Sequence, residues 1–419
     1  MPITLYNIIF GEFQDDCKAY EPTKEDHDFA FKFSLSMSKF YLSEKERMQE
    51  ARDQLEDYGL QFLPTEIHGY KTDGDMRCGK FCIGILEGKP ELCMGNAEPL
   101  FEAAWYYVAF TRHHLQANLG SHLPCFILYL AGKCACISCH CSVSYSNVCT
   151  TGAHIGFAGA IWTDRPHFQV LAPMLPLFYH ATDNNFRMRA ARYFGATKKA
   201  ILALKAYYES ELPRLSMAPT QRSPASPYPS EYECLDATED TTRTFEFVSP
   251  VDEDKLIFYG TAGHEKLCIK FVHRYSPEAH LKCADMGFAP ALRGFQPIPG
   301  GWYMVVMDCL DRGEYCDFAD SPNQESFETE IREKVGRLHQ ASFVHGDIRS
   351  SNIMVKKDSS PGIKLVDFDW AGIIGEVRYP ANVNMEIRRP SGVGDNELIM
   401  AEHDIQMIDF MFETRLQEK

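Results

Sequence analysis

The sequence predicts an α+β chain in two parts, an α/β part followed by a part in which strands come first and helices later. Residues 218–230 read APTQRSPASPYPS, and such a density of proline and small hydroxyl residues is typical of an extended linker. Strand and helix patterns alternate before this stretch, whereas three strand-like runs precede the main helices after it. With 419 residues, the chain has room for two or three domains of about 100–200 residues each.

We expect four segments: helix-rich residues 1–70, an α/β domain at 71–212, a Pro/Ser-rich linker at 213–236, and a second domain at 237–419. In the first segment, Ser43 can cap a helix that Glu46 supports and Gly59 ends. Apolar periodicity predicts the other elements of the first two segments. These are strands at 81–86 and 125–131, two more strands within 155–171, and helices at 99–116 and 184–211.

Composition and charge argue against several classes of function. The chain has 58 acidic and 42 basic residues and a net charge of −16, so we expect no nucleic-acid partner. It shows no secretory signal and no apolar run near the ~20 residues that a membrane crossing requires. Most of the 15 cysteines are then expected to be reduced thiols of an intracellular protein, in the cytoplasm or nucleus.

The strongest chemical pattern is the stretch HGDIRSSN at 345–352. A predicted helix at 325–340 precedes it and an apolar strand at 353–355 follows. A second strand at 363–366 then leads into Asp367-Phe368-Asp369. Helix, loop, hairpin and acidic motif in this order form the context that a phosphotransferase catalytic loop requires.

Phosphoryl transfer needs a carboxylate at the acceptor hydroxyl, a cation at the transferred phosphate, and oxygen ligands for Mg²⁺. The spacing in this stretch supplies all three. We expect Asp347 to orient the acceptor as a base and Arg349 to reach the γ-phosphate. Asn352 and Asp367 are the predicted metal ligands.

The strand runs upstream fit a nucleotide site. The run CIKFV places Lys270 between apolar neighbours, where it can bind the α- and β-phosphates of ATP. Glu278, in the first turn of the next predicted helix (277–286), can pair with Lys270 or can be a helix-N-terminal acid favoured by the helix dipole. Residues 305–310 resemble the strand and hinge against which an adenine lies.

Several features depart from the usual pattern of such a phosphotransferase domain. No G-x-G-x-x-G loop precedes the lysine strand, and the hairpin at 249–254 (SPVDED) is acidic where phosphates should bind. Asp369 occupies a position that is usually glycine, and Gly346 occupies one that is usually arginine. The helical part after the acidic motif is short. Within it, Asp404 is either the acid that fixes the catalytic-loop backbone or a solvated helix acid.

The phrases VHGDIR..NI and VDFDWAG..GEVRYP resemble kinase-like proteins of mushroom-forming fungi, some of them related to Crinkler effectors. The resemblance covers residues 245–412 and implies a two-lobed protein-kinase-like domain that uses ATP and Mg²⁺, with a protein Ser/Thr hydroxyl as acceptor. Glycine after the motif histidine is also usual in small-molecule kinases of the aminoglycoside-phosphotransferase type. The missing glycine loop leaves a third possibility, a pseudokinase that serves as a binding module.

In such chains the upstream region often resembles a restriction-endonuclease-type PD-(D/E)xK domain. Here Glu87-Gly88-Lys89 ends a predicted strand, Asp73 and Asp75 precede that strand, and a helix with Glu102 follows. In an active nuclease of this type the acids would hold a metal and the lysine would help to activate water. An E-x-K triplet is frequent by chance and the chain is acidic, so we expect a degenerate, structural version of the fold.

Residues 133–152 read KCACISCHCSVSYSNVCTTG and have three interpretations. The first is a retained intron, because Gly132-Lys133-Cys134 can be encoded with a splice-donor consensus and removal of the segment restores a strand-turn-strand pattern. The second is a surface loop with free thiols. The third is a zinc site, although the tight C-x-C-x₂-C-x-C spacing lacks a second cysteine pair at the usual distance.

Overall fold

The computed structural model describes residues 1–39, 41, 43–67, 69–89, 98–114, 122–132, 153–179, 182–215, 226–235, 242–252 and 255–413. The chain forms two compact units, Met1–Tyr228 and Pro229–Lys419, and the boundary lies within the predicted linker. The helix-rich residues 1–70 are part of the first unit. The cysteine-rich segment 133–152 lies outside the described residues, so its three interpretations stay predictions.

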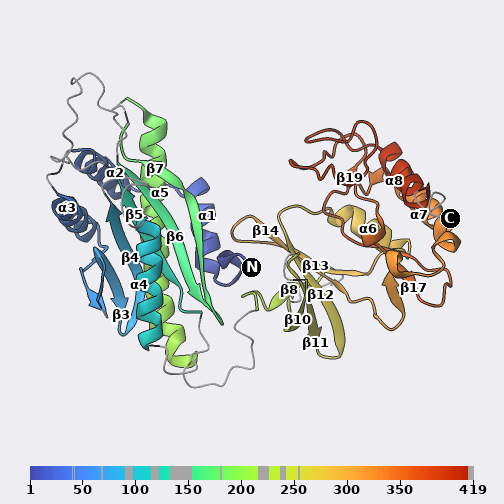
Figure 1. The fold of residues 1–419 in the computed structure, drawn as a ribbon, viewed down its shortest axis with the longest axis horizontal. Coiled ribbons are helices and arrows are strands. Elements are labelled where there is room, and N and C mark those ends of the chain that lie inside the picture. The colour runs from blue at the N-terminus through green and yellow to red at the C-terminus, as the bar shows by residue number, and fades with distance from the viewer. Residues whose placement is uncertain are drawn as a thin grey trace. The chain divides into compact units, whose positions relative to one another are not determined.

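Unit 1 is built around a mixed five-stranded sheet with the order β3-β4-β5-β6-β7 (Figure 1). Its strands are β3 (Gly74–Cys78), β4 (Phe81–Lys89), β5 (Cys125–Ala131), β6 (His154–Trp162) and β7 (Pro166–Pro176). Strands β4 and β5 are parallel, and the other neighbouring pairs are antiparallel. The remaining small elements of the unit are β1 (Glu66–Ile67), β2 (Tyr70–Lys71) and the 3₁₀ turn η1 (Ile3–Leu5).

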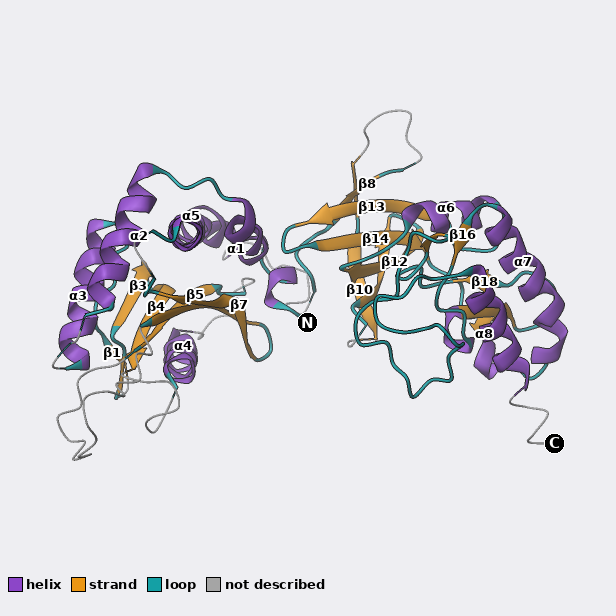
Figure 2. Cartoon of the chain, turned by 90° about the horizontal axis from the view of Figure 1, so that it is seen from above, coloured by secondary structure: helices purple, strands orange, loops and turns teal. Residues whose placement is uncertain are grey.

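Helices cover both faces of this sheet (Figure 2). Helix α4 (Pro99–His114) packs on one face. Helices α1 (Ile8–Ala19), α2 (Lys24–Met37) and α5 (Asn184–Leu215) lie on the other, with α3 (Glu44–Asp57) beside them. Every residue of β5 is buried, because its side chains point alternately to the two faces of the sheet and helices cover both faces. Phe126 and Leu128 join the core under α1, whereas Ile127 joins the one under α4.

The predicted helix at 43–59 is confirmed as α3. The Ser43 side chain accepts a hydrogen bond from the backbone N–H of Glu46, as an N-cap residue should. Gly59 follows the helix with φ +92°, a conformation that glycine adopts without strain. Strand β4 extends beyond its predicted end at residue 86, so Glu87 and Lys89 lie within the sheet.

Unit 2 begins with the pair β8 (Glu231–Glu233) and β9 (Thr242–Thr244), followed by a five-stranded antiparallel sheet with the order β10-β11-β12-β14-β13. Its strands are β10 (Glu246–Asp252), β11 (Ile257–Ala262), β12 (Glu265–Val272), β13 (Leu292–Ile298) and β14 (Trp302–Asp308). Helix α6 (Pro277–Asp285) connects β12 to β13, and Pro277 at its first position suits a helix start.

The rest of unit 2 is helical with short strand pairs. Helices α7 (Glu328–Gln340) and α8 (Ala401–Glu413) pack together, and the 3₁₀ turns are η2 (Phe318–Asp320), η3 (Gln324–Phe327) and η4 (Ser350–Asn352). Strands β15 (Tyr315–Asp317), β17 (Ile353–Lys356) and β18 (Lys364–Leu365) form one small sheet. Strands β16 (Phe343–Val344) and β19 (Gly372–Ile373) form another. This order confirms the α+β class. Within the described ranges, no helix combines the length and apolar character that a membrane crossing demands.

Candidate active site

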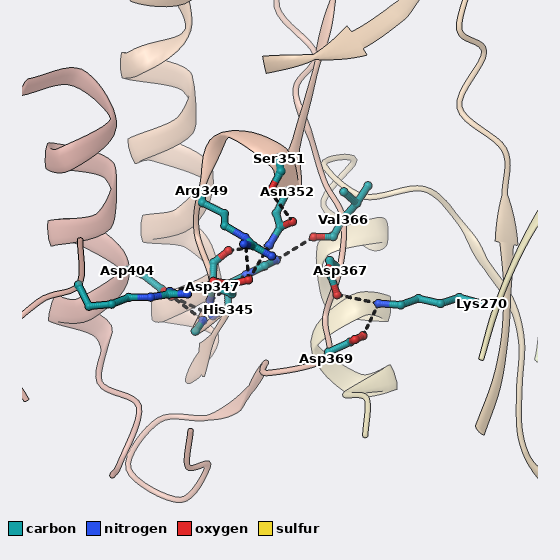
Figure 3. A network of polar contacts seen from close by, with 12 residues as sticks. Lys270, His345, Asp347, Arg349, Ser351, Asn352, Val366, Asp367, Asp369 and Asp404 are labelled. Carbon is teal, nitrogen blue, oxygen red and sulfur yellow. Dashed lines mark hydrogen bonds and ion pairs between the residues drawn. The ribbon is translucent and has the colours of Figure 1, made fainter. Parts of the chain in front are cut away.

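The loop 345–352 lies between β16 and β17, and a buried acid from α8 fixes its backbone (Figure 3). Asp404, only 1% exposed, accepts hydrogen bonds from the backbone N–H groups of His345 (2.8 Å) and Gly346 (2.9 Å). His339 Nε2 lies 3.0 Å from the same carboxylate. Of the two interpretations of Asp404, the structure therefore favours the loop-fixing acid, because a plain surface acid would face solvent.

A glycine occupies position 346 for a local structural reason. Its φ is +80°, and a Cβ atom there would lie 2.9 Å from Ile399 Cδ1 and 3.1 Å from the Trp370 carbonyl oxygen. A larger residue would strain the backbone and displace both neighbours.

His345 is fully buried and connects the loop to the acidic motif. Its Nε2 lies 3.1 Å from the carbonyl oxygen of Val366, and the backbone N–H of Asp347 donates to its Nδ1 at 3.3 Å. The ring also lies against Phe368, with centroids 5.2 Å apart. One side chain thus fixes the separation between Asp347 and Asp367.

The Asp347 carboxylate is enclosed by three donors. Asn352 Nδ2 donates to Oδ2 at 2.9 Å, and Arg349 Nε lies 2.9 Å from the same oxygen. Arg389 Nη1 donates to Oδ1 at 2.8 Å. The structure thus brings two predicted site residues, Arg349 and Asn352, onto Asp347. Arg389 has no counterpart in the sequence prediction, because it lies 42 residues away and outside any motif.

Lys270 lies in β12 opposite Val305 of β14, and its ammonium pairs with two carboxylates of the acidic motif (Figure 3). Its Nζ is 2.7 Å from Asp367 Oδ1 and 2.6 Å from Asp369 Oδ1. The alternative pairing with Glu278 is not formed, since that carboxylate accepts from Ser276 Oγ at 3.5 Å within the first turn of α6. Asp369, the departure from glycine, occupies the place expected for Glu278.

The lysine sets the charge of these acids. Burial alone would raise the pKa of Asp367, but Lys270 more than compensates and lowers the pKa below its usual range. Burial raises the pKa of Asp369 to about 7, against the lowering effect of Lys270 and with the repulsion of Asp367. Burial would lower the pKa of Lys270, but the two aspartates raise it, so the lysine stays charged. The carboxylate best suited to bind a cation is therefore Asp367.

The acidic motif is held in an uncommon conformation. Asp367 has φ +71°, in the left-handed region that residues other than glycine rarely adopt. Phe368 is fully buried and stacks on His280 of α6, with centroids 4.6 Å apart and planes within 8°. Burial lowers the pKa of His280 to about 4, so this ring is neutral at physiological pH.

A cavity of about 440 Å³ opens in front of these groups. Its lining comes from β11, β12, the end of β14 with the residues after it, the catalytic loop and the acidic motif. It includes Ile257, Tyr259, Cys268, Lys270, Met307, Cys309, Leu310, Asn352 and Asp367. Lys255 and Arg312 also line it, so the cavity has cationic groups although the hairpin is acidic by sequence. Residues 253 and 254 of that hairpin lie outside the described residues. The size and the lining suit a nucleotide.

The donor set on this cavity fits Mg²⁺. The amide nitrogen of Asn352 donates to the backbone carbonyl and the side chain of Asp347. The amide oxygen of Asn352 therefore points away from Asp347, and it accepts a hydrogen bond from the Ser351 hydroxyl at 3.2 Å. Asn352 and Asp367 then offer one amide oxygen and one carboxylate, and hard cations prefer such oxygen ligands when phosphate completes the shell. These two residues are the ones that would hold the ion.

The nuclease-like residues of unit 1 are only partly brought together. Asp73 Oδ2 accepts from the backbone N–H of Gly88 at 2.9 Å, and Lys89 pairs with Glu102 at 2.6 Å. Burial, followed by repulsion from Asp73 and Glu102, raises the pKa of Glu87 to about 9. Asp75 is elsewhere.

Asp75 faces a different set of partners. Its carboxylate pairs with Arg77 at 2.8 Å and accepts from the Tyr106 hydroxyl at 3.0 Å. Asp73, which lies one residue before β3 begins, therefore replaces Asp75 as the acid beside the Glu87 strand end. Among the described residues, no group of three or more His, Cys, Asp or Glu side chains is arranged to hold a metal ion.

Unit 2 has a protein-kinase-like fold, with a lysine-bearing antiparallel sheet, a helix, a catalytic loop and an acidic motif in that order. No family model and no curated protein matches the chain. Among solved structures, the chain is similar to the Cydia pomonella granulovirus kinase PK-1, with 16% identity and a TM-score of 0.32, over 41% of this chain and 69% of that one. It is also similar to vaccinia related kinase 3, with 14% identity and a TM-score of 0.31, over 40% of this chain and 63% of that one. At these values the likeness assigns no residue roles, which rest on the geometry of unit 2.

Proposed function

We propose that unit 2 is an ATP- and Mg²⁺-dependent phosphotransferase that acts on protein Ser/Thr hydroxyls. The observation that carries this proposal is the convergence of Lys270, Asn352 and Asp367 on one nucleotide-sized cavity beside Asp347. These four residues come from three separate stretches of chain, and each provides one of the groups that phosphoryl transfer needs.

In the proposed reaction the acceptor hydroxyl binds to Asp347. Its oxygen attacks the γ-phosphorus, the bond from that phosphorus to the β–γ bridging oxygen breaks, and the proton passes to Asp347 while ADP leaves. Lys270 neutralises charge on the α- and β-phosphates. Arg349, whose side chain is 33% exposed, can turn from Asp347 toward the γ-phosphate. Asn352 and Asp367 would hold Mg²⁺, which would supply positive charge to the phosphates.

The test is ATP turnover together with ATP-dependent thermal stabilisation, for the full chain and for Asp347→Ala. We expect Mg·ATP to stabilise both proteins and only the wild type to turn ATP over. Because a positioned base typically contributes about 10²–10⁴-fold, the variant should lose at least that much. A wild type with neither a nucleotide shift nor turnover would reject the enzyme proposal.

A second candidate function for unit 2 is a pseudokinase that binds partners. It is favoured by the absence of a glycine-rich loop in the sequence and by the occupation of both Asp347 oxygens. The same experiment separates the two, since a pseudokinase can show a nucleotide shift but no turnover in the wild type. A small-molecule hydroxyl as the acceptor is distinguished by supplying aminoglycosides and peptides in parallel.

We further infer that the chain is related to the fungal, Crinkler-type kinase-like proteins and that unit 1 is a degenerate PD-(D/E)xK-like domain with a structural role. A Glu87 carboxyl that is protonated at neutral pH and a Lys89 that is already paired favour this role over hydrolysis. Plasmid nicking with Mg²⁺ or Mn²⁺ tests it, comparing wild type with Glu87→Ala and Lys89→Ala. Nicking that both variants abolish would establish a working nuclease instead.

The nine described cysteines are all free thiols, and the net charge is −16. Both support our proposal that the protein acts in the cytoplasm or nucleus on a protein acceptor, with neither nucleic acid nor membrane as its partner.

A further inference from the structure

Arg389 contacts the carboxylate of Asp347, to which the acceptor hydroxyl binds in the proposed reaction. Its side chain is 3% exposed, its Nη1 donates to Asp347 Oδ1 at 2.8 Å, and its guanidinium lies 5.1 Å from the Trp370 ring centroid. Its Nε is buried and has no hydrogen-bond partner. Beside the carboxylate of Asp347, the protein therefore has a buried guanidinium with one N–H donor that makes no hydrogen bond.

The two oxygens of Asp347 are not equivalent. Oδ2 is shared by Asn352 and Arg349, whose positions belong to the catalytic loop itself. Oδ1 accepts only from Arg389 among the contacts of the described residues. An acceptor hydroxyl therefore gains the base most directly at Oδ1, where it competes with Arg389 Nη1 for the oxygen.

Displacement creates a charge problem that the acceptor has to solve. A guanidinium stays protonated at every physiological pH, and a buried one that loses its carboxylate is strongly destabilised. Arg389 would then have both Nη1 and Nε without a partner, and guanidinium N–H groups pair favourably with a carboxylate or a phosphate. An anion carried in with the hydroxyl would replace the lost carboxylate as the partner of the guanidinium.

We propose that Arg389 is the acceptor-selecting residue and that the site prefers a Ser/Thr hydroxyl flanked by an anionic group on the same peptide. The inference rests on the proposed kinase function and narrows its substrate class. The anion can be an acidic side chain or a phosphorylated one, since both present the same paired oxygens. Arg389 passes from Asp347 to this anion as the hydroxyl binds.

The test compares four peptides that differ only beside the acceptor serine, with Glu, phosphoserine, Gln or Lys there. For the wild type we expect kcat/KM for the Glu or phosphoserine peptide to exceed that for the Gln peptide by about tenfold, the effect of one charge-assisted contact. The two anionic peptides distinguish a carboxylate from a phosphate source. The Lys peptide should be the poorest substrate.

Two variants attribute the preference to Arg389. Arg389→Gln should reduce the Glu-to-Gln ratio to within about twofold, and Arg389→Lys, which keeps the charge without the planar guanidinium, should give an intermediate ratio. The matched control is Arg388→Gln. Arg388 is 60% exposed and pairs with Glu413 at 3.2 Å, so this variant should keep the wild-type ratio. Thermal unfolding of each variant checks its fold, and the wild-type ratio decides if Arg389→Gln does not fold.

The outcomes separate this inference from the proposed function. Phosphorylation of all four peptides with equal efficiency would overturn the role of Arg389 and leave the kinase function standing. Faster turnover of every peptide by Arg389→Gln, with no change in ratio, would make Arg389 an inhibitory plug and also overturn the inference. Absence of ATP turnover with any peptide would instead reject the kinase function.

Discussion

Each unit places a lysine among carboxylates, and the two arrangements differ in which acid stays ionised. In unit 2, Lys270 is almost buried and pairs directly with Asp367 and Asp369. In unit 1, Lys89 is 23% exposed and pairs with Glu102, while the buried Glu87 has an oxygen without any hydrogen-bond partner.

The consequence is chemical. The ion pair lowers the pKa of Asp367 despite its burial, so this carboxylate is available as a metal ligand. Burial raises the pKa of Glu87 to about 9, so this group is a neutral acid at pH 7. A lysine near a carboxylate is therefore no sign of an active site. The lysine has to contact the acid that the chemistry needs.

The largest expected effect separates the two lysines. Lys270→Met should reduce ATP turnover by about 10²–10³-fold, because the phosphates lose their buried cation and two aspartates lose their counter-ion. Lys89→Met should leave turnover within about twofold of wild type. Steady-state ATP consumption by the full chain measures both. Equal losses for the two variants would break the comparison.

The next effect concerns Asp404, a buried acid that accepts hydrogen bonds from two backbone N–H groups. Asp404→Ala should lower the free energy of unfolding by about 2–4 kcal/mol, because the buried N–H groups of His345 and Gly346 lose their acceptor. The control is Asp409→Ala on the same helix, whose carboxylate pairs with the partly exposed Arg332. It should cost about 0.5 kcal/mol or less in urea unfolding.

A smaller effect compares the two acids that could serve Lys270. Asp369→Asn should raise KM for ATP by about tenfold, since Lys270 would lose the partner that remains when Asp367 turns to a metal ion. Glu278→Gln should change KM by about twofold or less, because its carboxylate contacts Ser276 and not the lysine. A larger effect for Glu278 would show that α6 moves its acid onto Lys270 when nucleotide binds.

The smallest effect concerns Glu87 and depends on pH. The folded chain keeps a proton on Glu87 up to about pH 9, whereas the unfolded chain releases it near the ordinary value of 4.5. Raising the pH from about 4.5 to about 9 therefore lowers the free energy of unfolding, and this decrease is complete above about pH 9. Relative to wild type, Glu87→Gln should gain on the order of 1–3 kcal/mol between pH 6 and pH 9 in urea unfolding. Parallel pH curves for the two proteins would show that Glu87 is already ionised.

The sequence predicts the parts of the molecule that depend on neighbouring positions. The run at 125–131 is confirmed as β5, because an apolar run between breakers identifies a buried strand. The loop 345–352 is similar, since its donors and acceptors lie within eight positions of one another. The structure brings Asp347 and Asn352 together as that spacing suggests.

What the sequence does not predict depends on distant contacts. Asp369 lies 99 residues from Lys270, so local spacing gives no reason to prefer it to Glu278. Arg389 follows no motif and reaches Asp347 only through the path of the chain after β19. Asp73 lies just before β3, and its contact with Gly88, 15 residues along the chain, does not follow from local spacing.

The stack of Phe368 on His280 has a consequence for the design of inhibitors. The phenyl ring is held between the helix α6 and the catalytic-loop histidine, so turning it outward would break its contacts with the rings of Tyr275, His280 and His345 and leave a buried imidazole exposed to water. Compounds that need that ring displaced to reach a rear pocket should bind poorly. Flat, adenine-sized molecules that use only the front cavity along the hinge are the better starting point for chemical probes of this protein.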